Sequence, residues 1–449
     1  MTQFDVIVVG AGASGIAAAI SAARLKKSVL IIEKYGFTGG TATVGLVHHW
    51  DPVKIIEASG IAMEFYNRLK ERNALVDFDK TILDMPFSYW EGGAGFDPEE
   101  FKCVCLDMLL EENVTCLFHS SVTDIEMEDN RIRAVYVNNK SGKQRYQGKT
   151  FIDCTGDGDL FALAGCDYEV GDENGDCMSP TLAFRLGGVD TEQIYHYFDQ
   201  NPDQFGNHPR IGKYIRSYRE SAILQGFYQL IEDAKKAGDL KMPMPESGLG
   251  MTIQPRYGEF HINGTRTPNL NPLDGESLSR LEILEREHIK ELYHFIKKYI
   301  PGCENSYILQ TADTVGIRES RRLKGQYVLT EQDIRKGTHF KDSIVRNKWA
   351  HFDVHSGKSM QWSFELIEGP YYIPLRCLLS SQVYNLAVAG RCISCTHSAL
   401  ASIRIIPIGA LTGQAAGVAA AVSLNQGTNL NHVNHKEVIK TLQKNNVKL

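Results

Sequence analysis

The sequence predicts an α/β fold in which one domain, built around a parallel sheet, is assembled from both ends of the chain and interrupted by a central α+β domain. Three observations support this prediction. A strand, a glycine-rich turn, a helix and a second strand follow one another in residues 5–33. A strand, a glycine turn and an Ala-rich helix return in residues 386–424. The region between them, with helical stretches and Pro- and Gly-rich loops, has a different character.

The first elements are short and strongly patterned. Residues 5–9 (Asp-Val-Ile-Val-Val) form a β-branched run that is typical of a buried parallel strand. The Ala-rich residues 16–25 are expected to form a helix, and residues 28–32 a second strand. These elements together make a strand–turn–helix–strand unit.

The turn in this unit reads Gly10-Ala-Gly12-Ala13-Ser14-Gly15, the pattern that binds dinucleotides when it joins a strand to a helix. Gly10 permits the tight turn, Gly12 lets the backbone approach a pyrophosphate, and Gly15 lets the helix pack closely on the strand. The helix N-terminus then offers unpaired amides to the phosphates. Glu33, at the end of the second strand, is placed to bond an adenosine ribose hydroxyl, which favours FAD or NAD over NADP.

The following segments extend the same domain. Asp97-Pro98-Glu99-Glu100 is a helix start, with Asp97 as the cap and proline at the first helical position. A strand is expected at residues 114–118, and a further short strand at 151–154 precedes a glycine-rich turn, Thr155-Gly156-Asp157. Between these two strands we expect a β-meander of three strands, at residues 121–127, 131–137 and 143–146.

The central region is expected to hold two helical stretches, near residues 213–237 and 277–300. We therefore divide the chain into residues 1–166 and 375–449, which form the parallel-sheet domain, and residues 167–374, which form an inserted α+β domain on the substrate side.

Composition and charge exclude several classes of partner. The chain has 48 Lys and Arg and 54 Asp and Glu, and a formal net charge of −6 indicates neither a nucleic acid nor an anionic membrane as partner. Residues 405–424 are apolar and long enough to span a bilayer, but Pro407 and Gln414 interrupt them, so we expect a buried helix. We expect no signal peptide, and the ten cysteines do not form a disulfide pattern, which predicts a cytoplasmic location.

Taken together, the motifs resemble the family of FAD-dependent oxidoreductases whose FAD-binding domain is like that of glutathione reductase and fumarate reductase. The resemblance covers nearly the whole chain and implies a Rossmann-like domain with FAD bound in an extended form. The segments that carry it, in order, are GAGASG with Glu33, FTGGTATVG, FIDCTGDGD, DTVGIRESRR and NLAVAGRCISCTHSALASIRIIPIGALTGQAAG.

The resemblance also implies which residues contact the cofactor. The first glycine turn would lie against the pyrophosphate, Val122 against the adenine, and the helix start at residues 406–410 against the ribityl chain and flavin ring. The complete implied set is Gly10, Gly12, Ala13, Ser14, Gly15, Glu33, Lys34, Gly39, Gly40, Thr41, Ala42, Val122, Thr155, Gly156, Asp157, Gly390, Arg391, Ile406, Gly409 and Ala410.

The substrate side is predicted from single residues. His397 lies between the Gly390-Arg391 turn and the last helix, where an imidazole would serve as acid and base for a substrate hydroxyl. Arg404 and Arg318 are expected to orient the substrate, with Arg404 either binding a substrate carboxylate or steadying the reduced flavin. Asp353 and His355 would share one face of a strand, and we interpret this pair as a polar network, since two ligands are too few for a metal site.

We therefore predict an FAD-dependent oxidoreductase that transfers a hydride between a small polar organic substrate and the flavin, with no metal. No second GxGxxG motif follows a strand, which favours direct contact between flavin and substrate. Two alternatives stay open: a thiol–disulfide flavoenzyme using Cys392 and Cys395, and a non-catalytic flavin-binding protein. His48 and His49 also leave covalent attachment of the flavin open.

Overall fold

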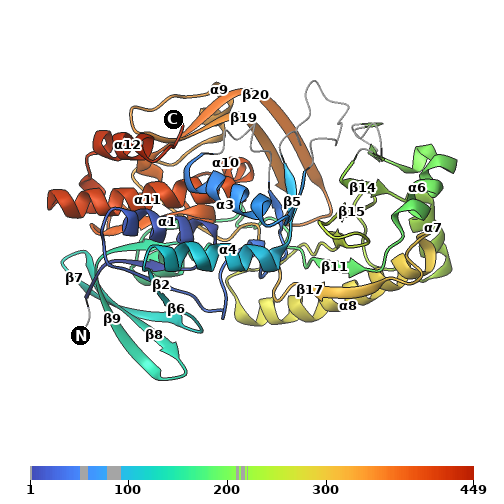
Figure 1. The fold of residues 1–449 in the computed structure, drawn as a ribbon, viewed down its shortest axis with the longest axis horizontal. Coiled ribbons are helices and arrows are strands. Elements are labelled where there is room, and N and C mark those ends of the chain that lie inside the picture. Colours follow the sequence, from blue (N-terminus) through green and yellow to red (C-terminus); the bar gives the residue numbers. More distant parts are fainter. Residues whose placement is uncertain (1–2, 51–58, 78–92, 209–211, 214–217, 220) are drawn as a thin grey trace.

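The computed structural model describes residues 3–50, 59–77, 93–208, 212–213, 218–219 and 221–449. Figure 1 shows two bodies side by side, and both ends of the chain lie in the same one. That body contains the parallel sheet with its covering helices, and the other contains a second sheet flanked by helices. The structure confirms the predicted α/β class.

The first sheet has a parallel half that draws on both ends of the chain. Its strands follow the order β6–β2–β1–β9, and β21 pairs with the carboxyl end of β9. All four pairings in this half are parallel. The strands span Gln3–Val9 (β1), Val29–Ile32 (β2), Thr115–Leu117 (β6), Gly142–Asp153 (β9) and Leu386–Val388 (β21).

The other half of this sheet is the predicted β-meander. Strands β7 (Ser121–Glu128), β8 (Arg131–Asn139) and β9 pair antiparallel in sequence order. The strands predicted separately at 143–146 and 151–154 are one strand, because β9 continues from its pairing with β8 into its pairing with β1.

Two helices from opposite ends of the chain pack tightly together over the sheet (Figure 1). They are α1 (Ala13–Arg24) and α11 (Ile406–Gln426). A Cβ on Gly413 would lie 2.0 Å from the Ser14 carbonyl oxygen, and one on Gly417 would lie 2.2 Å from that of Ala18. Because both distances are far below van der Waals contact, only glycine permits this approach of the two backbones.

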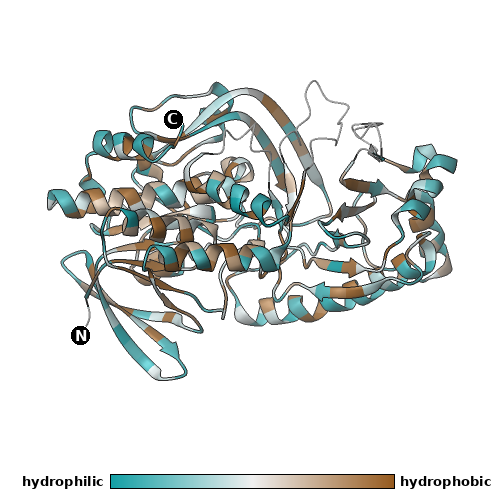
Figure 2. Cartoon of the chain, in the orientation of Figure 1, coloured by the Kyte–Doolittle hydropathy of each residue, from teal (hydrophilic) through white to brown (hydrophobic). Residues whose placement is uncertain are grey.

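Helix α11 is long and apolar enough to cross a membrane by length and composition, but 89% of its most apolar stretch is buried inside the protein. Figure 2 shows hydrophobic residues along α11 and the central strands, whereas the tip of the meander is hydrophilic. The helix therefore has the burial of a core helix, as the sequence predicts.

The second body is built on an antiparallel sheet with the order β14–β15–β16–β11–β17. Three helices, α6 (Thr191–Gln200), α7 (Tyr228–Ala237) and α8 (Gly275–Tyr299), accompany it. The strands are β11 (Phe184–Gly187), β14 (Ile223–Gly226), β15 (Leu249–Ile253), β16 (Phe260–Ile262) and β17 (Tyr307–Thr311). The prediction of α8 is confirmed.

The predicted helix at residues 213–237 is correct only from Tyr228 onward. Strands β13 (Gly212–Lys213) and β14 occupy the earlier positions, and residues 214–217 and 220 lie outside the described part of the chain. The helix starts late because β14 pairs with β15, and this sheet pairing overrides the local helical pattern.

A long antiparallel hairpin, β19 (Ser343–His355) and β20 (Trp362–Pro374), connects the two bodies, as Figure 1 shows. Ile344 and Ile373, near its base, are buried in the core of the first body, whereas Phe364 packs against the core of the second. The predicted domain boundaries at 166/167 and 374/375 stay predictions. The chain contributes to the core of the first body before residue 375, since Leu323 is already part of that core.

The described chain also contains shorter strands and further α-helices. They are β3 (His49–Trp50), α3 (Gly60–Glu71), β4 (Leu75–Asp77), β5 (Ala94–Phe96), α4 (Pro98–Glu111), α5 (Asp159–Leu163), β10 (Tyr168–Val170), β12 (Asn207–His208), β18 (Arg321–Leu323), α9 (Glu331–Lys336), α10 (His397–Ile403) and α12 (His435–Lys444). Helix α4 confirms its predicted start, because the Asp97 side chain accepts from the amides of Glu99 and Glu100.

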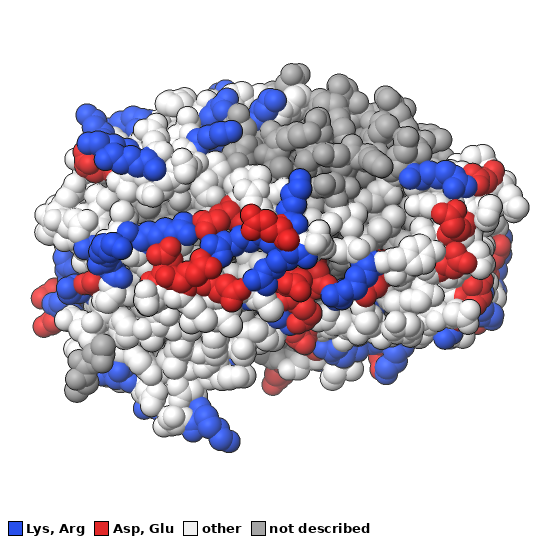
Figure 3. Space-filling view, in the orientation of Figure 1, with Lys and Arg blue, Asp and Glu red and all other residues white. Residues whose placement is uncertain are grey.

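The surface over α3 and α4 carries charges of both signs. Arg24 of α1 pairs with Glu64 at 2.9 Å and with Glu112 at 2.8 Å, and Arg68 pairs with Glu111 at 2.6 Å. Figure 3 shows basic and acidic side chains alternating in a band across this face. Such mixing gives this face no single-sign field that would attract a polyanion.

The packing of α1 on α11 yields a stability prediction. We expect Gly413→Ala to lower the free energy of unfolding by about 1–3 kcal/mol, because the new methyl group overpacks against the α1 backbone. Urea unfolding measures this loss. Gly275→Ala is the matched control, since a Cβ there meets nothing within 4 Å. Equal stability of Gly413→Ala and the wild type would contradict this account of the interface.

Candidate active site

The carboxyl ends of four parallel strands meet at one edge of the first sheet. The strand register places Val9 beside Ile32 and Asp153, and Asp153 beside Val388. The residues that follow these strands therefore converge at this edge. Ligands of open α/β sheets bind at such an edge, where the strand order reverses.

A cavity of about 790 Å³ begins at this edge and extends to the second sheet and the long hairpin. It brings together most of the residues predicted to contact the cofactor. Those that line it are Gly10, Gly12, Ala13, Ser14, Glu33, Lys34, Gly39, Gly40, Thr41, Ala42, Val122, Thr155, Gly156, Asp157, Gly390, Arg391, Ile406 and Gly409. Gly15 and Ala410 do not line it.

The glycines of the first turn have different roles. Gly10 has a φ of +97°, and a Cβ on Gly15 would lie 1.8 Å from the Gly10 carbonyl oxygen, so both are required by the fold itself. Gly12 has an ordinary φ of −75°, and the nearest atom to a Cβ there is 3.6 Å away. The fold tolerates a side chain at Gly12, and the space in front of it belongs to the cavity.

Two helix N-termini open on the cavity without side-chain caps. Helix α1 begins after Gly12 and α11 after Ile405, and neither has a cap hydrogen bond or an acidic residue in its first turn. Their free amides and positive dipole ends suit the pyrophosphate of a dinucleotide and a ring that gains negative charge. This donor set fits the FAD that the sequence motifs imply.

Glu33 lines the cavity beside the first glycine turn. Its Oε2 accepts from the Ala11 amide at 2.6 Å, and its Oε1 accepts from the Tyr35 amide at 3.0 Å. Burial raises the pKa of this carboxyl, although the backbone hydrogen bonds act in the opposite direction. The carboxylate thus braces the glycine turn while it lines the cavity.

A polar network holds three distant segments together at the middle of the cavity. Arg391 donates to the Asp157 carboxylate at 2.6 Å and to the Ser320 hydroxyl at 2.8 Å, and Ser320 donates to Asp157 at 2.8 Å. Burial acts to raise the pKa of Asp157, but Arg391 and Ser320 outweigh it and lower that pKa. The network fixes the cofactor-side loops of both chain ends.

The far end of the cavity is built by the long hairpin and the segment before α11. Asp353 accepts from Arg404 Nη2 at 2.6 Å and from the Trp362 indole at 2.6 Å, and His355 Nε2 lies 3.2 Å from its carboxylate. All four side chains line the cavity. The structure confirms the interpretation of Asp353 and His355 as a polar network.

His355 is held as a neutral imidazole. Burial lowers the pKa of His355 to about 3, although Asp353 acts to raise it, and the pKa of Asp353 lies well below its usual range. Because an ionised carboxylate only accepts, the hydrogen lies on Nε2, and the buried Nδ1 is an acceptor without a partner among the described residues.

Three arginines line this end of the cavity, one more than the sequence indicates. Arg318 and Arg404 were predicted to orient the substrate, and both are placed here. Arg266, in the loop after β16, belongs to no motif and is found only through the fold. The predicted carboxylate-binding residue Arg404 is already engaged by Asp353.

His397 lies outside the residues that line the cavity. It starts α10, and its Nδ1 is 2.8 Å from the fully buried carboxylate of Glu319, which also pairs with Arg322. The sequence predicts that this histidine lies near the flavin but does not reveal its pairing with Glu319.

The thiols of the Cys392-x-x-Cys395 motif are buried and do not line the cavity. Burial raises the pKa of Cys392 well above its usual range and that of Cys395 to about 12. Since the thiolate is the reactive form, these cysteines have the environment of inert core thiols. This disfavours the thiol–disulfide alternative.

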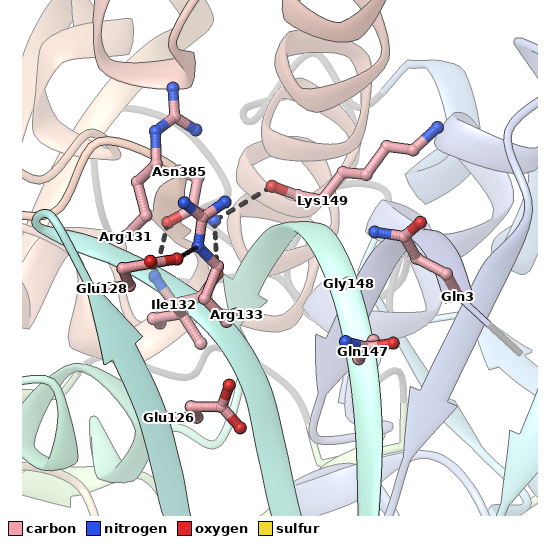
Figure 4. A pocket seen from close by; sticks show the side chains of 10 residues that line it. All are labelled: Gln3, Glu126, Glu128, Arg131, Ile132, Arg133, Gln147, Gly148, Lys149 and Asn385. Atoms are coloured by element: carbon pink, nitrogen blue, oxygen red, sulfur yellow. Dashed lines mark hydrogen bonds and ion pairs between the residues drawn. The ribbon is translucent and has the colours of Figure 1, made fainter. Parts of the chain in front are cut away.

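His49 lines the cavity and His48 does not, so covalent attachment of the flavin stays a prediction for His49 alone. The described residues contain no group of His, Cys, Asp and Glu suited to a metal ion. A second hollow of about 570 Å³, beside the meander, is drawn in Figure 4. Charged groups there pair locally, as Glu128 does with Arg133 at 2.7 Å.

Comparison with known proteins identifies the family. The family model for FAD dependent oxidoreductases matches residues 5–445. A search of curated proteins finds no match.

Solved structures share the fold at low sequence identity. A geranylgeranyl bacteriochlorophyll reductase-like protein from Thermoplasma acidophilum has a TM-score of 0.50 and 12% identity, over 99% of this chain and 83% of its own. The flavin-dependent brominase Bmp2 has a TM-score of 0.52 and 11% identity, over 99% and 83%. The myxobacterial chondrochloren halogenase CndH has a TM-score of 0.50 and 10% identity, over 99% and 79%.

The two glycines at the start of α1 give a test of the cofactor site. We expect Gly12→Ala to raise the Kd for FAD about tenfold or more, because its methyl group enters the space that the cofactor needs, while the apoprotein keeps its stability. Gly15→Ala should instead destabilise the apoprotein, since its methyl group meets the Gly10 carbonyl. Flavin fluorescence and urea unfolding measure the two effects; wild-type affinity in Gly12→Ala would count against this site.

Proposed function

This chain belongs to the family of FAD-dependent oxidoreductases, and we propose that it catalyses hydride transfer between the flavin and a small polar organic substrate bound at the far end of the cavity. One observation carries the proposal: a single cavity is lined both by the predicted cofactor residues and by the Asp353–His355–Arg404 network. A molecule bound against this network would lie in the same enclosure as the flavin.

In this proposal the chain's own residues bind, orient and deprotonate the substrate. Bound FAD supplies two-electron chemistry. We assign the proton acceptor for a substrate hydroxyl or amine to His355 Nδ1, the buried ring nitrogen that has no hydrogen-bond partner within the described residues. Asp353 holds the ring in the tautomer that leaves Nδ1 free, and Arg404 holds Asp353.

In this proposal His355, and not His397 as the sequence predicts, is the acid and base. His397 has a buried carboxylate partner and lies outside the cavity lining, whereas His355 is part of that lining. His397 then positions the start of α10 through Glu319.

Two finer points also stand as proposals. The motifs support an FAD-binding domain of the kind found in glutathione reductase and fumarate reductase. All ten cysteines, each in the described part of the chain, are free thiols, which supports a cytoplasmic location because free thiols persist in reducing compartments. The proposed partners are the substrate and FAD, with neither nucleic acid nor membrane.

The test of the reaction is reduction of the bound flavin without oxygen. We expect at least one compound from a panel of alcohols, hydroxy acids, sugars and amines to bleach the flavin of the holoprotein at a saturable rate. Stopped-flow absorbance measures this rate. A holoprotein whose flavin is reduced by dithionite but by no member of a broad panel would instead support a flavin-binding protein without turnover.

The proposed base gives a paired mutational test. We expect His355→Gln to slow flavin reduction by about 10²–10⁴-fold with an unchanged FAD content, because the proton acceptor is lost. His397→Gln, the matched control, should reduce the flavin at nearly the wild-type rate. If His397→Gln slowed flavin reduction much more than His355→Gln, His397 would be the base instead.

The dependence of kcat/KM on pH tests whether His355 is the base, because a purely structural histidine would not alter this dependence. A histidine with a pKa of about 3 has already lost its proton far below neutrality, so we expect kcat/KM to show no histidine ionisation between pH 5 and 8. A base with an ordinary pKa of about 6.5 would instead lose activity as the pH falls through that value.

A further inference from the structure

The far end of the cavity holds more positive than negative charge. Arg266, Arg318 and Arg404 all line it. Two carboxylates attract Arg318, those of Asp353 and Glu285, and Asp353 already accepts from Arg404. Glu285 is fully buried and accepts from the Thr267 hydroxyl. The three guanidinium groups therefore exceed the nearby carboxylates by one.

Arg318 is anchored but not neutralised. Its Nη1 donates to the Ser179 carbonyl at 2.6 Å and to the Thr181 hydroxyl at 2.7 Å. Both acceptors are uncharged, and within the described residues its Nη2 and Nε donate to no protein acceptor. The anchoring bonds fix the guanidinium plane while they leave one donor edge available.

Arg266 is held even more weakly. Its hydrogen bond in the described part of the chain is a long one, from Nη1 to the Met360 carbonyl at 3.4 Å. Its side chain is half-buried and lines the cavity. A guanidinium with so few acceptors has lost hydration without gaining a full set of partners, which is costly for a charged group.

The electrostatics of the arginines agree with this geometry. Burial, together with the nearby charges of Arg266 and Arg404, lowers the pKa of Arg318 to about 9, although Asp353 and Glu285 act to raise it. Burial and Arg404 likewise lower the pKa of Arg266. With a pKa of about 9, Arg318 is still a cation near neutrality, and it has no anionic hydrogen-bond partner among the described residues.

We infer that Arg266 and Arg318 form a carboxylate-binding subsite, and that the substrate is a small organic carboxylate. This inference rests on the proposed function, because only that function makes the bound carboxylate a substrate. A planar carboxylate matches the donor fork of a guanidinium in two parallel hydrogen bonds. Phe364 and Trp362, which also line this end, suit the carbon skeleton that accompanies such a group.

This assignment changes the role predicted for Arg404. The Arg404 guanidinium is committed to the carboxylate and carbonyl of Asp353, at 2.6 and 2.7 Å. Arg404 is therefore a positioning residue for the Asp353–His355 pair, and substrate binding falls to the other two arginines. A carboxylate bound there would also add negative charge beside His355 and strengthen it as a base.

The test compares carboxylates with neutral compounds of the same shape. Lactate and succinate are titrated into holoprotein and apoprotein against lactamide and succinamide, with inorganic phosphate as a further arm. The readouts are the change in the flavin absorbance spectrum and the shift in unfolding temperature. We expect saturable binding of the carboxylates and no binding of the amides at equal concentration.

Variants locate the subsite. We expect Arg318→Gln and Arg266→Gln each to raise the carboxylate Kd about tenfold or more while FAD content is unchanged, and Arg318→Lys to recover part of the loss because it restores charge without the fork. Arg133→Gln, in the separate hollow of Figure 4, is the matched control and should bind as the wild type does.

The outcomes separate this inference from the proposed function. Equal binding of amides and carboxylates, tighter binding of phosphate, or wild-type carboxylate affinity in both glutamine variants would overturn the subsite, even with a reducible flavin in place. Carboxylate binding to the apoprotein, seen in the unfolding temperature and lost in the variants, would support the subsite even if no compound reduced the flavin.

Discussion

The close packing of α1 on α11 is the constraint on which the rest of the structure depends. Gly413 and Gly417 bring the backbone of the C-terminal helix against that of the N-terminal one, and β9 pairs in parallel with strands from both ends. Because the two helices start at the same sheet edge, their uncapped N-termini both face the cavity. Segments that are almost 400 positions apart in the sequence thus form a single binding site.

The two ends of this cavity use different chemistry. The cofactor end relies on backbone, through glycine turns and free helix amides, which approach a ligand closely and need no particular side chain. The far end relies on charged side chains from the second body and the long hairpin, which Arg404 and Asp353 tie to the first. This division suits an enzyme family in which all members bind the same cofactor through backbone groups, whereas each member binds its own substrate through particular side chains.

Most residues predicted to contact the cofactor line one cavity, and their sequence signals are contiguous. A glycine turn between a strand and a helix, followed by Glu33, is readable in one stretch, and the β-meander and α11 follow from local patterns. Sequence reasoning failed where distant pairing decides the outcome. Strand β14 occupies the first part of a predicted helix because it pairs with β15. The pairing of His397 with Glu319 likewise depends on residues that are far apart in the sequence. Arg266 carries no local signal, since only the fold places it beside Arg318.

A crystal structure of the protein with its bound FAD tests the central claim most directly. The account predicts one extended FAD in the cavity, with its pyrophosphate at the Gly10–Gly15 turn and its ring between the start of α11 and the end that holds Arg318 and His355. An FAD bound outside this cavity, or lying with its ring at Glu33, would contradict it.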